Sequence, residues 1–271
     1  MDPYYISLFV VLGAFTGFAA GLLGIGGGMI LVPFLTMLLP KLGVPPLLVV
    51  HASIATAMST IIFTSVSSMR AHQAHQAIRW DIVWLMVPGL VVGGLLSGGA
   101  VFAYINGFVL ALFFMSFVFY TAIKMFIDTK PPVGQGLPGP WVVRAMGSAI
   151  GFISGLLGAG GGFLSIPFLI RSNITMPVAV GTSAALGFFI ALANGAGYLV
   201  SGDKLTDLSA GMLGYVYWPA LVVLVATSML TAPLGARTAH KMPVKRLKRI
   251  FASMLFLLAI QMLIDTIKVH F

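Results

Sequence analysis

The chain contains no cysteine and very few charged residues. Without cysteine, disulfides, thiolate metal sites and cysteine redox chemistry are excluded. Only 8% of its 271 residues are charged, whereas a soluble domain carries about 25%. A chain with so few charges cannot cover a surface that faces water. The composition therefore predicts an integral membrane protein in contact with the lipid bilayer.

Acidic residues and catalytic motifs are equally scarce. All six acidic residues lie at the ends of predicted spans or in loops, which argues against a carboxylate-based proton or sodium site inside the membrane. The chain has no HExxH and no Gly-x-Ser-x-Gly, and its five histidines are scattered. An enzyme needs a nucleophile with a base, or a metal cluster, so we predict no enzyme, no cofactor and no resident metal.

What the chain has in abundance is apolar sequence, at 59% of its residues and a mean hydropathy of +1.05. Its apolar runs of about 20 residues match membrane-spanning helices and not the short alternating strands of a β-barrel. We therefore predict an all-α polytopic protein. The net charge of +9 is typical of cytoplasmic loops in such proteins and does not indicate nucleic-acid binding. The first run follows no basic signal-peptide region and is expected to be retained.

A glycine-rich motif interrupts the apolar sequence twice. Gly21-Leu22-Leu23-Gly24-Ile25-Gly26-Gly27-Gly28 precedes Pro33-Phe34-Leu35, and Gly155-Leu156-Leu157-Gly158-Ala159-Gly160-Gly161-Gly162 precedes Pro167-Phe168-Leu169. Between Gly17–Leu35 and Gly151–Leu169, 12 of 19 positions are identical at an offset of 134. Interrupted apolar segments at matching places in two halves indicate the binding site of a secondary transporter.

The rest of the chain repeats in the same order. We expect a first repeat over residues 1–128, a linker over 129–140 and a second repeat over 141–271, together forming one membrane domain. Each repeat begins with a glycine-broken pair of apolar segments, Tyr5–Leu23 with Met29–Leu39 and Trp141–Leu157 with Phe163–Ile170. Full spans are predicted for Leu47–Met69, Ile82–Ala103, Gly107–Ile127, Pro177–Val200, Met212–Leu234 and Ile250–Ile267.

The distribution of the 15 Lys and Arg residues between the two sides of the membrane distinguishes between two topologies. If each broken segment crosses the membrane once, they divide 7 to 8 between the two sides. If each forms a re-entrant helical hairpin, twelve lie on one side and only Lys41, Lys204 and Lys268 lie opposite, which obeys the positive-inside rule. We therefore predict two inverted-topology repeats, each a hairpin plus three transmembrane helices. The protein would lie in the cell (inner) membrane with both termini outside and the loops 70–81, 129–144 and 237–249 in the cytoplasm.

The breaks are candidate anion sites. Consecutive glycines permit sharp turns, and the helices that follow would point their N-termini, with free amides and a positive dipole end, at the membrane midplane. Glycines that only allow close helix packing are the alternative. The candidate residues at the breaks are Gly26, Gly27, Gly28, Met29, Gly160, Gly161, Gly162 and Phe163.

Polar residues in the next span of each half complete the predicted site. Ser53, Thr56, Thr60 and Thr64 share one helix face, and Asn194 stands where the second copy matches Thr64. Hydroxyl groups can bind an oxyanion there, or can bond back to their own helix. His51 is a candidate ligand or proton-coupling group, or an ordinary hydrogen-bonded residue. The substrate-binding candidates in these spans are His51, Ser53, Thr56, Thr182, Ser183 and Asn194.

The paired glycine motifs and Val180-Gly181-Thr182-Ser183 resemble the sulfite exporter TauE/SafE family of membrane proteins over essentially the whole chain. The first copy has His51-Ala52 in place of Gly-Thr, so the two half-sites differ. The resemblance implies export of sulfite, sulfoacetate or related organosulfonates.

We therefore expect a transporter that exports a small sulfur-containing anion by alternating access. A negative-inside potential assists export of a monoanion by about 2.3 kcal/mol per 100 mV. A permease for another small solute, such as a carboxylate or a metal ion, is the alternative within transport, and an intramembrane enzyme or a sensor protein is the alternative outside it. The sequence leaves homo-oligomerisation open.

Overall fold

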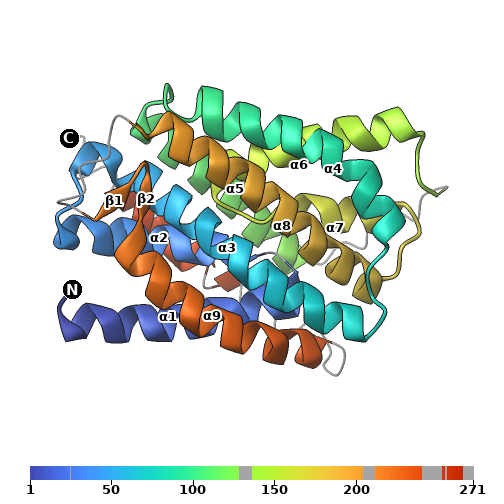
Figure 1. Ribbon diagram of the computed structural model, residues 1–271, viewed down its shortest axis with the longest axis horizontal. Coiled ribbons are helices and arrows are strands. Elements are labelled where there is room, and N and C mark those ends of the chain that lie inside the picture. Colours follow the sequence, from blue (N-terminus) through green and yellow to red (C-terminus); the bar gives the residue numbers. More distant parts are fainter. Residues whose placement is uncertain (25, 128–135, 204–210, 240–251, 254, 265–271) are drawn as a thin grey trace.

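The computed structural model describes residues 1–24, 26–127, 136–203, 211–239, 252–253 and 255–264. Within these ranges nearly every segment is helical (Figure 1). The elements of the first half are α1 (Pro3–Leu23), α2 (Gly28–Leu38), the 3₁₀ turns η1 (Leu39–Leu42) and η2 (Pro46–Leu48), α3 (Val49–Ala74), α4 (Trp80–Leu95), the π-helical turn η3 (Leu96–Val101) and α5 (Gly107–Ile127).

The second half also begins with a long and a short helix that long helices follow, and it contains a pair of short strands. Its elements are α6 (Pro140–Leu157), α7 (Gly162–Arg171), α8 (Met176–Ser201), the short antiparallel strands β1 (Met212–Leu213) and β2 (Val216–Tyr217), and α9 (Trp218–Ala239). A further apolar helix covers Leu255–Ile264.

Seven helical stretches among the described residues are long and apolar enough to cross a membrane. They are Pro3–Leu23, Pro46–Ala74, Trp80–Val101, Gly107–Lys124, Pro140–Leu157, Met176–Ser201 and Trp218–Ala239. This confirms a predominantly helical, multi-pass membrane protein, to which the structure adds the two short strands. The expected last span, Ile250–Ile267, lies partly outside the described residues, as do most of the 129–140 linker and the basic loop 237–249.

The two long helices that precede the glycine motifs, α1 and α6, begin and end in the same way. Proline occupies the first turn of α1 and of α6, where its missing N–H costs nothing. Asp2 caps α1 by accepting a hydrogen bond from the Tyr4 amide at 2.9 Å. The helices end at Gly24 and Gly158, whose φ angles of 66° and 60° favour glycine. The chain then turns back as α2 and α7.

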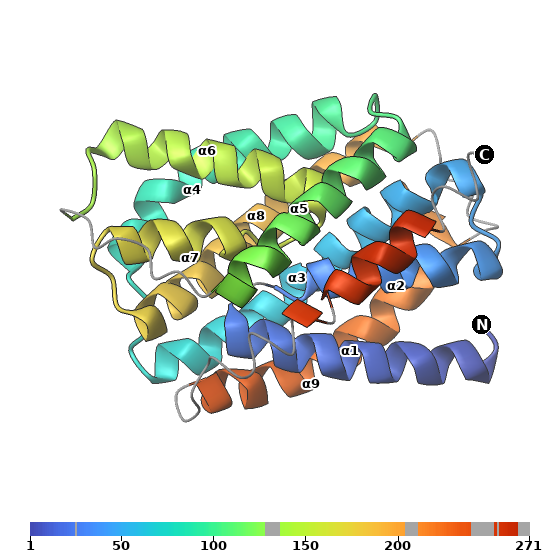
Figure 2. The same ribbon diagram turned by 180° about the vertical axis from the view of Figure 1, so that it is seen from behind.

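These two helix pairs enter the bundle from opposite ends. Figures 1 and 2 show α2 returning toward the end of the molecule where α1 begins, and α7 returning toward the opposite end, where α6 begins. Between them, α3 and α8 pack against each other through the centre, and each also contacts a helix of the other half: α3 contacts α9, and α8 contacts α4.

Glycine seams hold the outer helices together. On α1, Gly13, Gly17 and Gly21 are spaced by four, and a Cβ on any of them would overlap the backbone or side chains of α9. On α6, Gly147 and Gly151 lie at the same offset of 134 and would overlap the backbone of α4. Small residues let helix backbones approach closely where lipid removes the hydrophobic drive for association. The seams therefore fix α1 against α9 and α6 against α4.

One predicted helix was partly wrong. The span expected at Met212–Leu234 begins only at Trp218, because residues 212–217 form the β1–β2 ribbon. Its turn places Gly214 at a φ of 57°, which glycine adopts without strain. The Tyr217 amide donates to Thr56 Oγ1 at 2.9 Å and so attaches the ribbon to α3.

Candidate functional site

The glycine motifs adopt left-handed backbone at the predicted positions. Gly26 and Gly27 have φ angles of 78° and 72°, and Gly161 has 75°. Gly27 and Gly161 are the N-caps of α2 and α7, which therefore begin at Gly28 and Gly162. A glycine has no side chain to cap a helix, and neither first turn contains an acidic residue. The positive ends of both helices thus lack side-chain compensation.

The two breaks contact each other inside the bundle, although 134 residues separate them. A Cβ on Gly26 would lie 3.1 Å from the Cα and N atoms of Gly160, and a Cβ on Gly28 would overlap the carbonyl oxygen of Gly158. Only residues without a side chain permit this approach at these positions. The turns that begin α2 and α7 are therefore neighbours in the fold.

A small hollow lies beside this contact, with a cavity volume of about 10 Å³, which is room for roughly one water molecule in this conformation. It is lined by Ala20, Gly24, Gly26, Ile61, Thr64, Ser65, Ser68, Gly160, Ser183, Ala184 and Gly187. These lining residues are uncharged and come from both breaks and from both central helices, α3 and α8. The hollow brings together three of the predicted site residues: Gly26, Gly160 and Ser183.

Ser183 connects the two halves at the hollow. Its hydroxyl donates to the Gly24 carbonyl at 3.0 Å and accepts from the Ser165 hydroxyl of α7 at 2.9 Å. The side chain is fully buried. The proton of this hydroxyl is committed to Gly24, so Ser183 can donate to a bound solute only by exchanging that bond, whereas its second lone pair remains able to accept.

The α3 wall of the hollow is polar at its C-terminal part. The Thr64 hydroxyl pairs with Ser228 Oγ of α9 at 2.8 Å, and Ser65 donates to the carbonyl of Ile61 in its own helix. Ser68 Oγ is buried and has no hydrogen-bond partner among the described residues. Thr64 belonged to the predicted hydroxyl stripe but not to the final candidates, and Ser65 and Ser68 belonged to neither. The signal was present, because Ser68 continues the spacing of Thr60 and Thr64.

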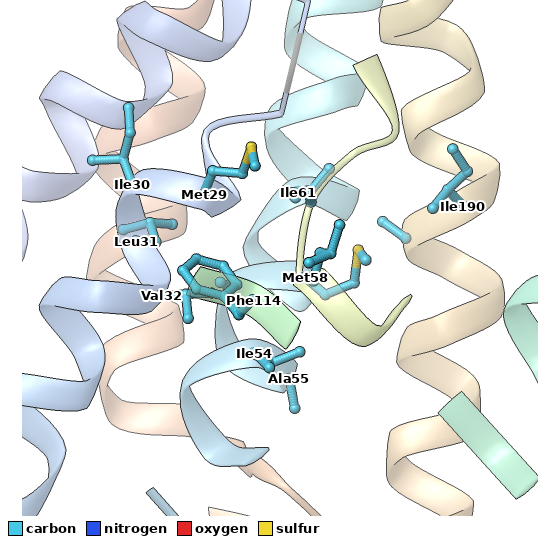
Figure 3. Close-up of a cluster of buried hydrophobic side chains, with 14 of the residues drawn as sticks. Met29, Ile30, Leu31, Val32, Ile54, Ala55, Met58, Ile61, Phe114 and Ile190 are labelled. Atoms are coloured by element: carbon cyan, nitrogen blue, oxygen red, sulfur yellow. The ribbon is translucent and has the colours of Figure 1, made fainter. Parts of the chain in front are cut away.

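Two residues predicted at the breaks have side chains that pack in the apolar core. Met29 is 1% exposed and lies in the apolar cluster of Figure 3, beside Ile30, Leu31 and Val32 of its own helix. Phe163, its counterpart on α7, is partly buried against the same core. Their side chains do not line the hollow, although their amides remain in the first turns of α2 and α7.

The start of α3 is far from the hollow. His51 precedes Thr64 by 13 residues, which is about 20 Å along a helix. Its Nε2–H donates to the Ile105 carbonyl at 3.0 Å, and its ring stacks on Tyr215. Burial raises the pKa of the Tyr215 phenol, which stays neutral. His51 thus joins α3 to the loop before α5 and to the ribbon.

Ser53 and Thr56 share this part of α3 with His51. Both side chains are fully buried. Thr56 accepts the Tyr217 amide, and Ser53 Oγ has no hydrogen-bond partner within the described part of the chain. Neither residue lines the hollow. The structure therefore divides the predicted hydroxyl stripe, and only its C-terminal part reaches the two breaks.

Thr182 and Asn194 also lie on α8. One precedes and the other follows the residues of α8 that line the hollow. Thr182 Oγ1 accepts the Arg79 amide at 3.0 Å and so holds the connection before α4. The Asn194 side-chain amide donates to the carbonyls of Gly151 and Ile190, at 3.2 and 2.9 Å. Neither side chain lines the hollow.

Comparison with known proteins identifies a matching family and several similar proteins. Residues 9–262 match the family model described as "Sulfite exporter TauE/SafE". A probable membrane transporter protein of Haemophilus influenzae is 34% identical over 95% of this chain and 98% of its own length. Similar proteins with the same description occur in Methanocaldococcus jannaschii, at 26% identity over 96% of both chains, and in Bacillus subtilis, where YunE is 25% identical over 96% of this chain and 98% of its own. No solved structure matches the chain.

Proposed function

Because the chain belongs to the sulfite exporter TauE/SafE family of membrane transporters, we propose that it exports a small sulfur-containing anion, such as sulfite or an organosulfonate. The observation that carries the proposal is the meeting of the two glycine breaks, Gly26 against Gly160, beside a hollow with hydroxyl-bearing walls. Non-helical backbone at membrane depth is tolerated only where protein or a water-filled cavity satisfies it. A shared break of this kind is where such a protein would hold its solute.

The electrostatics of the breaks favour an anion. The first amides of a helix have no partner within that helix, and they carry part of the positive end of its dipole. At α2 and α7 these amides follow Gly27 and Gly161 without a capping side chain. The Ser68 hydroxyl of α3, which lines the hollow and has no hydrogen-bond partner among the described residues, adds a further donor. A metal ion is a weaker candidate, because the described residues contain no group of three His, Cys, Asp or Glu side chains.

The packing supports an inverted repeat as the frame of this site. The contact of α1 with α9 has its counterpart in the contact of α6 with α4, and the contact of α3 with α9 has its counterpart in that of α8 with α4. A two-fold operation that exchanges the halves maps each pair onto the other. Since α1 and α6 enter from opposite ends, the axis of this operation would lie in the membrane plane.

The positions of the charges support the orientation. Arg70 lies in the last turns of α3, Arg171 at the end of α7 and Arg237 in the last turn of α9, and these helix ends share one end of the molecule (Figures 1 and 2). Lys41, in η1, lies near the other end, where α1 begins. Under the positive-inside rule the first end is cytoplasmic. The N-terminus and Lys41 are then outside, and α1–α2 and α6–α7 are hairpins entering from opposite faces.

An apolar cluster separates the hollow from the outer end of α3. The hollow begins at Ile61 and follows α3 toward Ser68, while Ile54 and Met58 lie on the other side and pack with Val32 and other core residues (Figure 3). In an alternating-access cycle this cluster would be the outer barrier. The described conformation would then be closed to the outside, and export would require Ile54 and Met58 to part from α2.

A thermal-stability screen of the purified protein tests the proposal. Sulfite, sulfoacetate, taurine, sulfate, thiosulfate, a simple carboxylate and a divalent metal are compared at equal ionic strength. We expect one sulfur anion to raise the melting temperature and the Ser183→Ala variant to lose most of that rise. A rise with the carboxylate or the metal alone would assign the chain to a different solute, and the sulfur-anion proposal would fail.

A further inference from the structure

Four side chains that carry a hydroxyl group line the hollow beside the two breaks. They are Thr64, Ser65 and Ser68 of α3 and Ser183 of α8, and each is at most 5% exposed. A hydroxyl group carries one proton and two lone pairs, so it can donate one hydrogen bond and accept two. The proton or lone pair that each hydroxyl still has free decides which chemical group fits between them.

Three of these hydroxyls have already engaged their proton. Ser65 and Ser183 each donate to a backbone carbonyl. The Thr64 hydroxyl lies 3.0 Å from the Thr60 carbonyl and 2.8 Å from the Ser228 hydroxyl, which hold its proton between them. Toward a group in the hollow, Ser65 and Ser183 can therefore accept a hydrogen bond but can donate none without breaking one.

Ser68 is the exception among the four. Its Oγ is buried and has no hydrogen-bond partner among the described residues. Buried polar atoms are normally satisfied by protein, by ordered water or by a bound ligand. The proton of Ser68 is thus available to an acceptor that occupies the hollow.

The second half offers no equivalent donor. Tyr198 stands at the position that matches Ser68, at the same offset of 130 that relates Ser53 to Ser183. The Tyr198 hydroxyl donates to the Gly155 carbonyl. The unengaged proton of Ser68 is therefore a property of the first half and not a consequence of the repeat.

One donor and two acceptors around a space for one water molecule match a hydroxyl group. Such a group accepts from Ser68 and donates its own proton to Ser65 or Ser183. A fully deprotonated oxygen would also accept from Ser68, but it would turn its negative charge toward the lone pairs of the other two serines. No lining residue is an acid or a base, so the solute has to bring this proton itself.

We propose that the hollow binds a hydroxyl group of the transported sulfur anion. The substrates are then monoanions that retain an O–H group, such as hydrogen sulfite or a hydroxyalkanesulfonate. This inference rests on the proposed function and narrows its class of solute. The uncapped starts of α2 and α7 favour the negative charge, and the three serines select the proton. The hollow has room for this one group in the described conformation, and the rest of the anion enters when its walls separate during the transport cycle.

The test compares two sulfonates with the same number of non-hydrogen atoms. Hydroxyethanesulfonate carries a terminal hydroxyl where propanesulfonate carries a methyl group, and both are monoanions. We expect the first to raise the melting temperature of the purified protein at about one tenth of the concentration that the second requires, which is the effect of about one hydrogen bond. Sulfite and sulfate form the second pair, at a slightly acidic pH where sulfite carries a proton and sulfate does not. Sulfite should raise the melting temperature more than sulfate does.

Ser68→Ala should require about ten times more hydroxyethanesulfonate, or hydrogen sulfite, for the same rise in melting temperature. The variant should fold, because this hydroxyl makes no hydrogen bond with the described residues that the change would remove. Ser67→Ala is the matched control. Its hydroxyl is adjacent in α3 but donates to the Met229 carbonyl at 2.7 Å, and the residue does not line the hollow. This control should keep the anion response of the wild type.

The outcomes separate this inference from the proposed function. A response confined to one pair, and to its hydroxyl-bearing member, would support the hydroxyl site and identify the source of the hydroxyl. Equal rises within a pair, a larger rise with the member that lacks the hydroxyl, or an unchanged response in Ser68→Ala would overturn the hydroxyl site and leave the export of a sulfur anion standing. If no sulfur anion changes the melting temperature, the proposed function fails and the hydroxyl site fails with it.

Discussion

Substituting Gly26 by alanine tests whether the meeting of the two breaks is the binding site. Gly26 has a φ of 78°, and a Cβ there would lie 3.1 Å from Gly160 Cα and from Ile61 Cδ1. The change therefore introduces backbone strain and also pushes the two breaks apart. Gly43→Ala is the matched control, because Gly43 has a φ of 88° but nothing within 4 Å of a Cβ.

Both variants should lose stability through backbone strain, and only Gly26→Ala should lose more through steric overlap. An L-residue in left-handed backbone costs about 1–2 kcal/mol, and inserting a methyl group into a packed site costs about 1–3 kcal/mol more. We expect Gly43→Ala to lose only the first amount and Gly26→Ala to lose both, or about 2–5 kcal/mol. For a chain of this size each kcal/mol corresponds to roughly 2–4 °C in melting temperature.

The decisive measurement is the rise in melting temperature caused by the anion identified in the stability screen. Gly43→Ala should melt lower than the wild type but show the same rise with the anion. Gly26→Ala should show none, because its Cβ occupies the wall shared by the hollow and Gly160. A Gly26→Ala protein that folds and responds to the anion like the wild type would refute the assignment of the breaks as the site.

Three other changes probe the remaining parts of the structure. Thr56→Val should lower the free energy of unfolding by about 1–3 kcal/mol, because the buried Tyr217 amide loses its acceptor; Thr60→Val, whose hydroxyl bonds only within α3, should cost less in the same denaturation experiment. Gly17→Leu should disrupt the α1–α9 seam, where even a Cβ overlaps Ser228, and so lower the yield of folded protein in size-exclusion chromatography far more than Leu at the open Gly139. Because the chain has no cysteine, single cysteines at Gly43 and Asn173 can report topology: an impermeant maleimide should label the first in intact cells and the second only after permeabilisation, and labelling of both in intact cells would contradict the inverted hairpins.

The glycine motifs could be predicted from the sequence because their effect is local. Three consecutive glycines end one helix and begin another wherever they occur, so the expected starts at Met29 and Phe163 fall within one residue of those observed at Gly28 and Gly162. The effect of the proline in the first turn of α8 is equally local, and the expected start at Pro177 is one residue from Met176. The β1–β2 ribbon was missed because residues 212–217 are as apolar as the helix that follows, and the bond that attaches them to Thr56 spans 161 residues.

The candidate site was harder to predict because helical spacing does not say how far along a helix a ligand lies. Ser53, Thr56 and Thr64 share a face, yet only Thr64 reaches the hollow, and the others meet the ribbon or the core. Adjacent residues also have different partners: Ser183 donates to the Gly24 carbonyl, whereas Thr182 accepts from the Arg79 amide. Such choices depend on which helix lies opposite, and a single sequence does not contain that information.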